Sequence, residues 1–389
     1  MKNKKIIFVS EKYGFWGGVE KYIFNMAKLF KENGFIVYGL FEIKLDNSQD
    51  FNEYFEKVYF FDKENTDFDI DCEIAILHKT LNINLLNYVI NKFKTISIIH
   101  DHDYYCIRRH KYFPFIRKNC SLPFNTAYCT LCISAGGMVI KDPNNKLKFR
   151  KIEPFKQRKI LKIIKKSNKL IVLSEFMKNN LLKNGVKQDK IVKVYPYVEL
   201  EEKKAEENIE IKKISKLLYV GQITRGKGVD ILIDALEYVK SPYELNIIGT
   251  GNDFDYIKNR INELNLNNKV KMLGFCKDTD KFYKDSDIII VPSRWQEPFG
   301  LIGIEAYTHN KPVIARNVGG ISEWLKDKKN GYLINSNKPE DFSIKIEKLI
   351  NSVDDQKKMG IYGNNMLRAD YSKEKFLEKF SNLIGELDE

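Results

Sequence analysis

Two carboxylates stand eight positions apart in the segment VPSRWQEPFGLIGIE, residues 291–305: Glu297 and Glu305. The preceding run DIIIVPS, residues 287–293, has the composition of a short buried strand, and Pro298 begins a turn that leads into a helical pattern. Carboxylates at a strand-to-helix junction accept hydrogen bonds from vicinal hydroxyl groups, such as those of a ribose or another sugar. The alternative is a pair of solvated acids in a helical first turn, which is a common arrangement.

The start of the same helix favours an anionic ligand. Free N–H groups and the helix dipole suit a phosphate or a sugar hydroxyl, which points to the backbone of Phe299, Gly300 and Leu301. Together with the two carboxylates, this predicts a ligand with a ribose at one end, a diphosphate in the middle and a sugar at the other.

Glycine-containing loops follow several other predicted strands. Gly17 and Gly18 come after the first strand and allow close approach of the backbone to a ligand. Arg225 and Lys227 lie in a loop where cations could neutralise a diphosphate leaving group without a metal ion. In two further strand-end loops, Gly249 and Phe275 are candidate contacts for the ligand, the latter for a nucleobase. Solvated loops are the alternative interpretation.

The segment IIHDHD places His100 at the end of another predicted strand. An imidazole there can hydrogen-bond a substrate or shuttle a proton near neutral pH, and His102 is the second candidate for this role. His78, which ends the strand EIAILH, is interpreted as a buried structural side chain.

Four of the six cysteines fall close together, at Cys106, Cys120, Cys129 and Cys132. Their spacing predicts a structural zinc site or an iron–sulfur cluster that holds an irregular insertion together, with reduced free thiols as the alternative.

These side chains must be positioned by alternating strands and helices. Short β-branched runs separated by helical patterns recur along the 389 residues, which predicts an α/β fold of two Rossmann-like, doubly wound domains facing across a cleft. We expect an N-terminal, acceptor-binding domain at residues 1–199 with an insertion at 101–150, and a nucleotide-sugar-binding domain at 214–370. Residues 199–213 have the charged composition of a linker between the domains. The C-terminal helix at 371–389 could cross back to the first domain.

The net charge of +13 is concentrated in residues 141–169, which hold twelve Lys or Arg residues against two acidic ones. Such a basic amphipathic segment predicts peripheral contact with a membrane, and a solvated helix is the alternative. No zinc-finger or RNA-binding aromatic motif accompanies the charge, so we expect no nucleic-acid partner. The charged start MKNKKIIFVS and the lack of an eighteen-residue apolar stretch predict a cytoplasmic protein, at the inner face of the membrane if the basic segment docks there.

With these residues assembled, the chain resembles the glycosyl transferases group 1, the family-four retaining glycosyltransferases of GT-B fold. The family's E-x7-E motif matches Glu297 and Glu305, which the resemblance assigns to the donor sugar and the ribose respectively. Its glycine turn matches Gly17 and Gly18, and its basic pair falls at Gln222 and Lys227. The first position of this pair is more often Arg, and Arg225 could compensate for the glutamine.

The resemblance implies retaining, metal-independent transfer of a sugar from a UDP- or GDP-sugar to a glycan or lipid-linked acceptor in bacterial surface polysaccharide or glycan synthesis. It assigns catalytic roles to His100 and Glu297, and no cofactor to catalysis. Asp-x-Asp triplets such as Asp278 and Asp280 read as helix caps and first-turn acids rather than metal ligands. The alternatives are a nucleotide-sugar epimerase of the same fold and a non-enzymatic basic module that binds membrane or nucleic acid.

Overall fold

The computed structural model describes residues 3–62, 68–113, 116, 118–135, 139–141, 147–149, 153–200 and 214–388. In the first half, β-branched and aromatic runs form a sheet of seven parallel strands in the order β11-β10-β5-β4-β1-β2-β3. Its strands are β1 (Lys5–Tyr13), β2 (Ile36–Lys44), β3 (Lys57–Phe60), β4 (Ile74–Leu77), β5 (Lys94–Ile99), β10 (Lys169–Val172) and β11 (Ile191–Lys193). β11 was not expected from the sequence, because it has only three residues.

Helices cover both faces of this sheet, as a parallel sheet requires. They are α1 (Gly18–Glu32), α2 (Ile83–Lys92), α4 (Pro154–Ile164) and α5 (Glu175–Lys183), with 3-10 turns η1 (Gln49–Tyr54) and η2 (Gln188–Lys190). Local signals fix their starts: the Asn82 side chain caps α2, Ser174 caps α5, and Pro154 opens α4.

The second half repeats the architecture with six parallel strands in the order β14-β13-β12-β15-β16-β17. These are β12 (Ser215–Val220), β13 (Tyr243–Ile248), β14 (Val270–Gly274), β15 (Ile288–Val291), β16 (Val313–Arg316) and β17 (Gly331–Ile334). Around them lie η3 (Arg225–Lys227), α6 (Val229–Leu236), α7 (Phe254–Glu263), α8 (Asp280–Asp285), α9 (Leu301–Thr308), α10 (Ile321–Trp324) and α11 (Pro339–Ile350).

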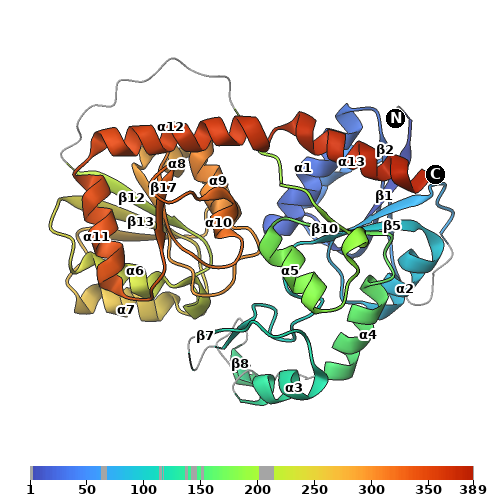
Figure 1. The fold of residues 1–389 in the computed structure, drawn as a ribbon, viewed down its shortest axis with the longest axis horizontal. Coiled ribbons are helices and arrows are strands. Elements are labelled where there is room, and N and C mark those ends of the chain that lie inside the picture. Colours follow the sequence, from blue (N-terminus) through green and yellow to red (C-terminus); the bar gives the residue numbers. More distant parts are fainter. Residues whose placement is uncertain are drawn as a thin grey trace.

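Two helices at the end of the chain connect the two halves. Figure 1 shows α12 (Val353–Asp370) along the second domain and α13 (Lys373–Asp388) over the first. The apolar side of α13 buries Phe376, Phe380, Leu383 and Ile384 in the core cluster that α1 and β1 form. The last helix therefore belongs to the hydrophobic core of the first domain, although it follows the second in sequence.

An insertion lies between β5 and α4, at the lower edge of Figure 1. Its elements are the antiparallel pair β6 (Tyr112–Phe113) and β7 (Lys118–Asn119), the helix α3 (Thr126–Ser134), and the pair β8 (Val139–Lys141) and β9 (Leu147–Phe149). These pairs were not predicted. Within the described ranges, no helix has both the length and the hydropathy needed to cross a membrane. Parts of the basic segment 141–169 and residues 201–213 of the linker lie outside the described residues.

Candidate functional site

Glu297 lies in the loop between β15 and α9, and it is buried, with 6% of its surface exposed. Its Oε1 accepts hydrogen bonds from Lys227 Nζ at 2.6 Å, Ser293 Oγ at 2.6 Å and Trp295 Nε1 at 3.0 Å. Burial alone would raise the pKa of Glu297, but the charge of Lys227 and these three donors bring it below its usual value. The carboxylate is therefore ionised, and no described residue donates to Oε2.

The backbone around Glu297 is held by the loop after β16. Gly320 N donates to the Glu297 carbonyl at 2.7 Å. Gly319 has a φ of +60°, and a Cβ there would lie 2.0 Å from the same carbonyl oxygen. Only glycine permits this approach, so the close packing of the two loops holds the backbone carbonyl of Glu297.

The two cations of the predicted diphosphate loop have different surroundings. Lys227 reaches Glu297, whereas Arg225 pairs with Asp230 at 3.2 Å and with Asp253 at 3.4 Å. The Arg225 guanidinium also lies over the Tyr256 ring. Lys227 is thus at the candidate site, while Arg225 is held by its own acidic partners.

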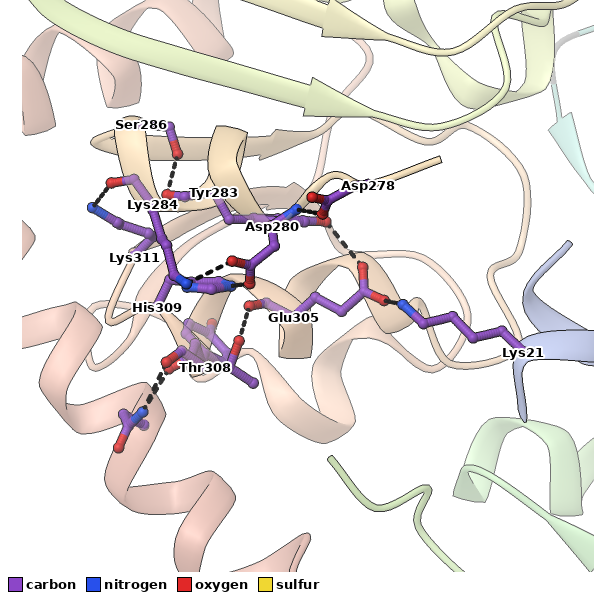
Figure 2. Close-up of polar contacts among 12 residues, drawn as sticks. Lys21, Asp278, Asp280, Tyr283, Lys284, Ser286, Glu305, Thr308, His309 and Lys311 are labelled. Carbon is purple, nitrogen blue, oxygen red and sulfur yellow. Dashed lines mark hydrogen bonds and ion pairs between the residues drawn. The ribbon is translucent and has the colours of Figure 1, made fainter. Parts of the chain in front are cut away.

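Glu305 lies on α9 and contacts both domains (Figure 2). Its Oε1 is 3.3 Å from Lys21 Nζ on α1, and its Oε2 accepts from Tyr283 Oη at 3.1 Å. Nearby, His309 Nε2 lies 3.1 Å from Asp280 Oδ1. Lys21 and Tyr283 were not expected from the sequence to contact Glu305. The position of Lys21 four residues beyond Gly17 was the available signal for a cation close to the glycine turn.

A cavity of about 870 Å³ opens between the domains, and near α9 it is lined by Thr308 and His309 rather than by Glu305. Its lining comes from α1, the start of α13, the chain at 198–200, and the ends of α8 and α9, where Asp280 and His309 contribute. This interdomain cavity is therefore close to the C-terminal end of α9, and its lining does not include Glu297 or Lys227.

The glycines and the phenylalanine predicted as ligand contacts have different surroundings. Gly17 caps α1 in an extended conformation, and a Cβ on Gly18 would meet no atom within 4 Å. Gly249 has a φ of +137°, and a Cβ there would lie 1.8 Å from the Gly221 carbonyl, so it holds two strand-end loops together. Phe275 is 76% exposed.

At the start of α9, the residues predicted for phosphate contact are closely packed. Phe299 is buried, and its carbonyl already accepts from Trp324 Nε1 at 2.6 Å. Gly300 caps the helix with a φ of +89°, and Leu301 begins it. The N–H groups of Gly300 and Leu301 lie at the helix start, and N–H groups in this position suit an anionic ligand.

His100 follows β5, and its Nε2 lies 3.1 Å from Nδ1 of the buried His78. One of the two rings must donate to the other, so the pair is held together as neutral imidazoles. Burial lowers the pKa of His100 to about 4, against the smaller raising effect of Asp101. Next to it, Lys79 Nζ bridges the carboxylates of Asp101 and Asp103.

The four cysteines of the predicted metal site are free thiols. Among the described residues, no three His, Cys, Asp or Glu side chains are placed to hold a metal ion. Arg108 Nε instead lies 3.2 Å from Cys132 Sγ, which places a cation at one of the thiols. A metal held by Cys106, Cys120, Cys129 and Cys132 stays a prediction. Elemental analysis of the purified protein tests the zinc or iron–sulfur prediction directly.

Residues 201–366 match the model of the family described as glycosyl transferases group 1. An uncharacterized glycosyltransferase of Methanocaldococcus jannaschii is 32% identical over 57% of this chain and 61% of its own length. A poly(ribitol-phosphate) alpha-N-acetylglucosaminyltransferase of Staphylococcus aureus is 30% identical over 61% of this chain and 47% of its own. The chain therefore matches less than two thirds of the length of these curated relatives.

Solved structures match nearly the whole chain. Anabaena HepE in complex with UDP and glucose superposes with a TM-score of 0.70 at 15% identity, over 99% of this chain and all of HepE. TarM gives a TM-score of 0.72 at 17% identity over 98% of each chain. At these identities the structures establish the fold. The resemblance inferred from the sequence is confirmed: the chain has the GT-B fold, and its residues 201–366 match the family model of the glycosyl transferases group 1.

Proposed function

We propose that the protein is a retaining glycosyltransferase that moves a sugar from a UDP- or GDP-sugar to a glycan or lipid-linked acceptor in bacterial surface polysaccharide or glycan synthesis. The observation that carries this proposal is the ion pair between Lys227 and the buried Glu297, at 2.6 Å. The names of the relatives support the reaction class, and the complexes of HepE with UDP and UDP-glucose support a nucleotide-sugar donor.

In this proposal Lys227, Glu297 and Glu305 each bind a different part of the nucleotide-sugar donor. Lys227 faces the diphosphate and offsets the negative charge that develops on the leaving group. Glu297, ionised and with Oε2 free of described partners, accepts a hydrogen bond from a hydroxyl of the donor sugar. When the donor binds, the Glu305 carboxylate gives up its contact with Lys21 and accepts hydrogen bonds from the ribose hydroxyls instead.

The chemical step needs no protein nucleophile. The departing phosphate takes the proton of the acceptor hydroxyl as that oxygen attacks the same face of the sugar from which the phosphate leaves. Glu297 is held by three donors on one oxygen and has a lowered pKa, so it acts as a hydrogen-bond acceptor rather than as a proton donor. His100, neutral and next to His78, is assigned a hydrogen bond to the transferred sugar.

A thermal-shift series with UDP-, GDP- and ADP-sugars tests the donor assignment. A ligand at about 100 times its dissociation constant adds about 2.7 kcal/mol to the free energy of unfolding, so the correct donor raises the midpoint clearly. The Lys227→Ala variant should lose most of this shift. If no nucleotide sugar stabilises the wild-type protein, the proposal fails.

Peripheral membrane contact is part of the same proposal, since lipid-linked acceptors reside in membranes. Tyr128 and Leu131 on α3 are each 66% exposed, and Phe155 at the start of α4 is 69% exposed. The two helices pack together, and α4 carries exposed cations at Lys156, Arg158, Lys159 and Lys162. Exposed apolar side chains beside cations suit an anionic lipid surface at the cytoplasmic face.

Sedimentation with vesicles tests this contact. We expect binding to vesicles that contain phosphatidylglycerol and much weaker binding to pure phosphatidylcholine. Leu131→Glu should reduce the binding, whereas Tyr238→Glu, at a half-exposed side chain of the second domain, should not. Equal binding by both variants and the wild type would argue against this surface.

A further inference from the structure

The loop that carries Glu297 is bonded to the first domain on both sides of that residue. The Gln296 carbonyl accepts from His102 Nε2 at 3.0 Å, and the Pro298 carbonyl accepts from Ser174 Oγ at 2.7 Å. Neither contact involves the Glu297 side chain. The first domain therefore holds the backbone of the donor loop immediately before and after the carboxylate.

The Gln296 side chain makes a third connection, to the insertion. Its Nε2 donates to the carbonyls of Lys111 and Cys120, at 2.9 and 2.8 Å. Those two residues flank the β6–β7 pair, and Cys120 N donates to the Lys111 carbonyl at 2.7 Å. Gln296 is buried, and both amide protons are used, so this side chain closes the open end of the hairpin.

His102 has a defined hydrogen-bonding state in this arrangement. A carbonyl can only accept, so His102 Nε2 carries the proton, and Nδ1 accepts from Tyr105 Oη at 2.8 Å. Both ring nitrogens are thus committed, and the ring is buried. His102 serves to hold the donor loop and is not free to shuttle a proton.

The insertion also covers Trp295. The His110 and Trp295 rings lie with centroids 4.0 Å apart, and Trp295 Nε1 donates to Glu297 Oε1. The insertion therefore contacts two neighbours of the Glu297 carboxylate. His110 packs on Trp295, whose indole donates to the carboxylate, and Lys111 and Cys120 accept from Gln296, which precedes Glu297.

We propose that Gln296 is a positioning residue, and that it latches the insertion of the first domain onto the donor loop so that domain closure sets the orientation of Glu297. The inference rests on the proposed function for the role of Glu297, but the latch itself does not. Lys227 and Glu305, which the proposed function assigns to the diphosphate and the ribose, stay in place when the latch opens, so most of the donor affinity is kept. The orientation of Glu297 toward the transferred sugar is lost.

Gln296→Met keeps the side-chain volume and removes both amide hydrogen bonds. We expect kcat to fall roughly 10- to 100-fold, since loss of alignment carries a cost of that order, while the donor Kd stays within about threefold. Gln188→Met, at an exposed glutamine on η2, is the matched control and should leave both unchanged. His102→Gln, which can still donate to the Gln296 carbonyl, should retain more activity than His102→Ala.

Tryptophan fluorescence reports the latch without any substrate. Trp16 is 71% exposed and Trp324 is buried, so in a Trp16→Phe background acrylamide quenching reports mainly on Trp295. Gln296→Met should increase this quenching, and Gln188→Met should not.

The proposal is overturned if Gln296→Met leaves kcat and quenching at wild-type values. It is also overturned if the donor Kd weakens in parallel with kcat, because the loop would then be part of the donor site alone. A wild-type protein that binds no nucleotide sugar refutes the proposed function, yet an increase in quenching on Gln296→Met would still support the latch. Circular dichroism of each variant confirms that it folds.

Discussion

At the scale of single residues, the candidate site is organised around charges that are buried and paired. Glu297 is inside the protein because Lys227 neutralises it and two neutral donors complete its hydrogen bonds. Removing one partner of such a pair leaves the other charge without compensation, which is costly. Lys227 and Glu297 therefore depend on each other for the geometry of the site.

We predict that Lys227→Ala lowers the transfer rate by roughly 30- to 1000-fold, because a charged partner in a closed cleft contributes on the order of 2–4 kcal/mol. Glu305→Ala should have an effect of the same order. Steady-state kinetics with the donor identified by thermal shift provides the measurement. Lys258→Ala, at an exposed lysine of α7, is the control. Activity within a factor of about two of wild type for both site variants would refute the donor site.

We also predict that catalysis requires no divalent cation, because in the proposed donor site Lys227 and the helix N–H groups offset the charge of the diphosphate. In the Asp278–Asp280 triplet, Asp278 Oδ1 accepts from Asp280 N, and Asp280 pairs with His309, so both carboxylates have local roles. Transfer assays with EDTA should match those without it. Full inhibition that manganese or magnesium reverses would contradict this.

At the scale of elements, the last helix illustrates how a segment can be distant in sequence and central in the fold. α13 buries Phe376, Phe380 and Leu383 against α1, and Phe30 meets Phe380 edge-on at 5.6 Å. Contacts of this kind stabilise the first domain through a helix that begins where the second domain ends. The same helix keeps the domains linked along the top of the molecule (Figure 1).

We predict that Phe380→Ala destabilises the protein by roughly 3–5 kcal/mol, as large-to-small changes in a core do. The side chain is completely buried, whereas Asn382 is exposed, so Asn382→Ala should change stability little. Urea unfolding of both variants measures the difference. Equal midpoints would show that α13 contributes little to the first domain.

At the scale of the whole molecule, several neutral histidines gather where the two domains meet. Burial lowers the pKa of His100, His102 and His110 to about 4, from 6.5 in an unfolded chain. Between these values the unfolded chain binds protons that the folded chain does not. The stability contributed by the neutral rings is therefore complete above pH 6.5 and is lost as the pH falls toward 4.

We predict that the free energy of unfolding decreases between pH 6.5 and pH 4.5. Asp103 acts in the opposite direction, since burial raises its pKa to about 6, but it is one group against three. Denaturation at a series of pH values measures the slope. His110→Gln removes one titrating ring and should flatten the profile, and a wild-type profile without a slope in this window would contradict the prediction.

Much of the architecture was accessible from local sequence patterns. Alternating β-branched runs and helical periods predicted the two parallel sheets, because a parallel strand buried on both faces must be apolar throughout. The spacing of Glu297 and Glu305 across a strand, turn and helix identified the part of the second domain where the candidate site lies. Gly17 and Gly18 were predicted in the same way, since a glycine pair after a strand is a local signal, and the structure has them at the start of α1.

The partners of these residues were decided by the tertiary structure. Nothing local distinguishes Lys227, which reaches Glu297, from Arg225, which is held by Asp230 and Asp253. Lys21 meets Glu305 across 284 positions of sequence, and packing of the two domains alone brings them together. The close cysteine spacing predicted a metal site, and this stays a prediction until the metal content of the protein is measured. The spacing of residues along the chain predicts helices, strands and turns. Contacts between side chains that are distant in sequence depend instead on how whole helices and strands pack together.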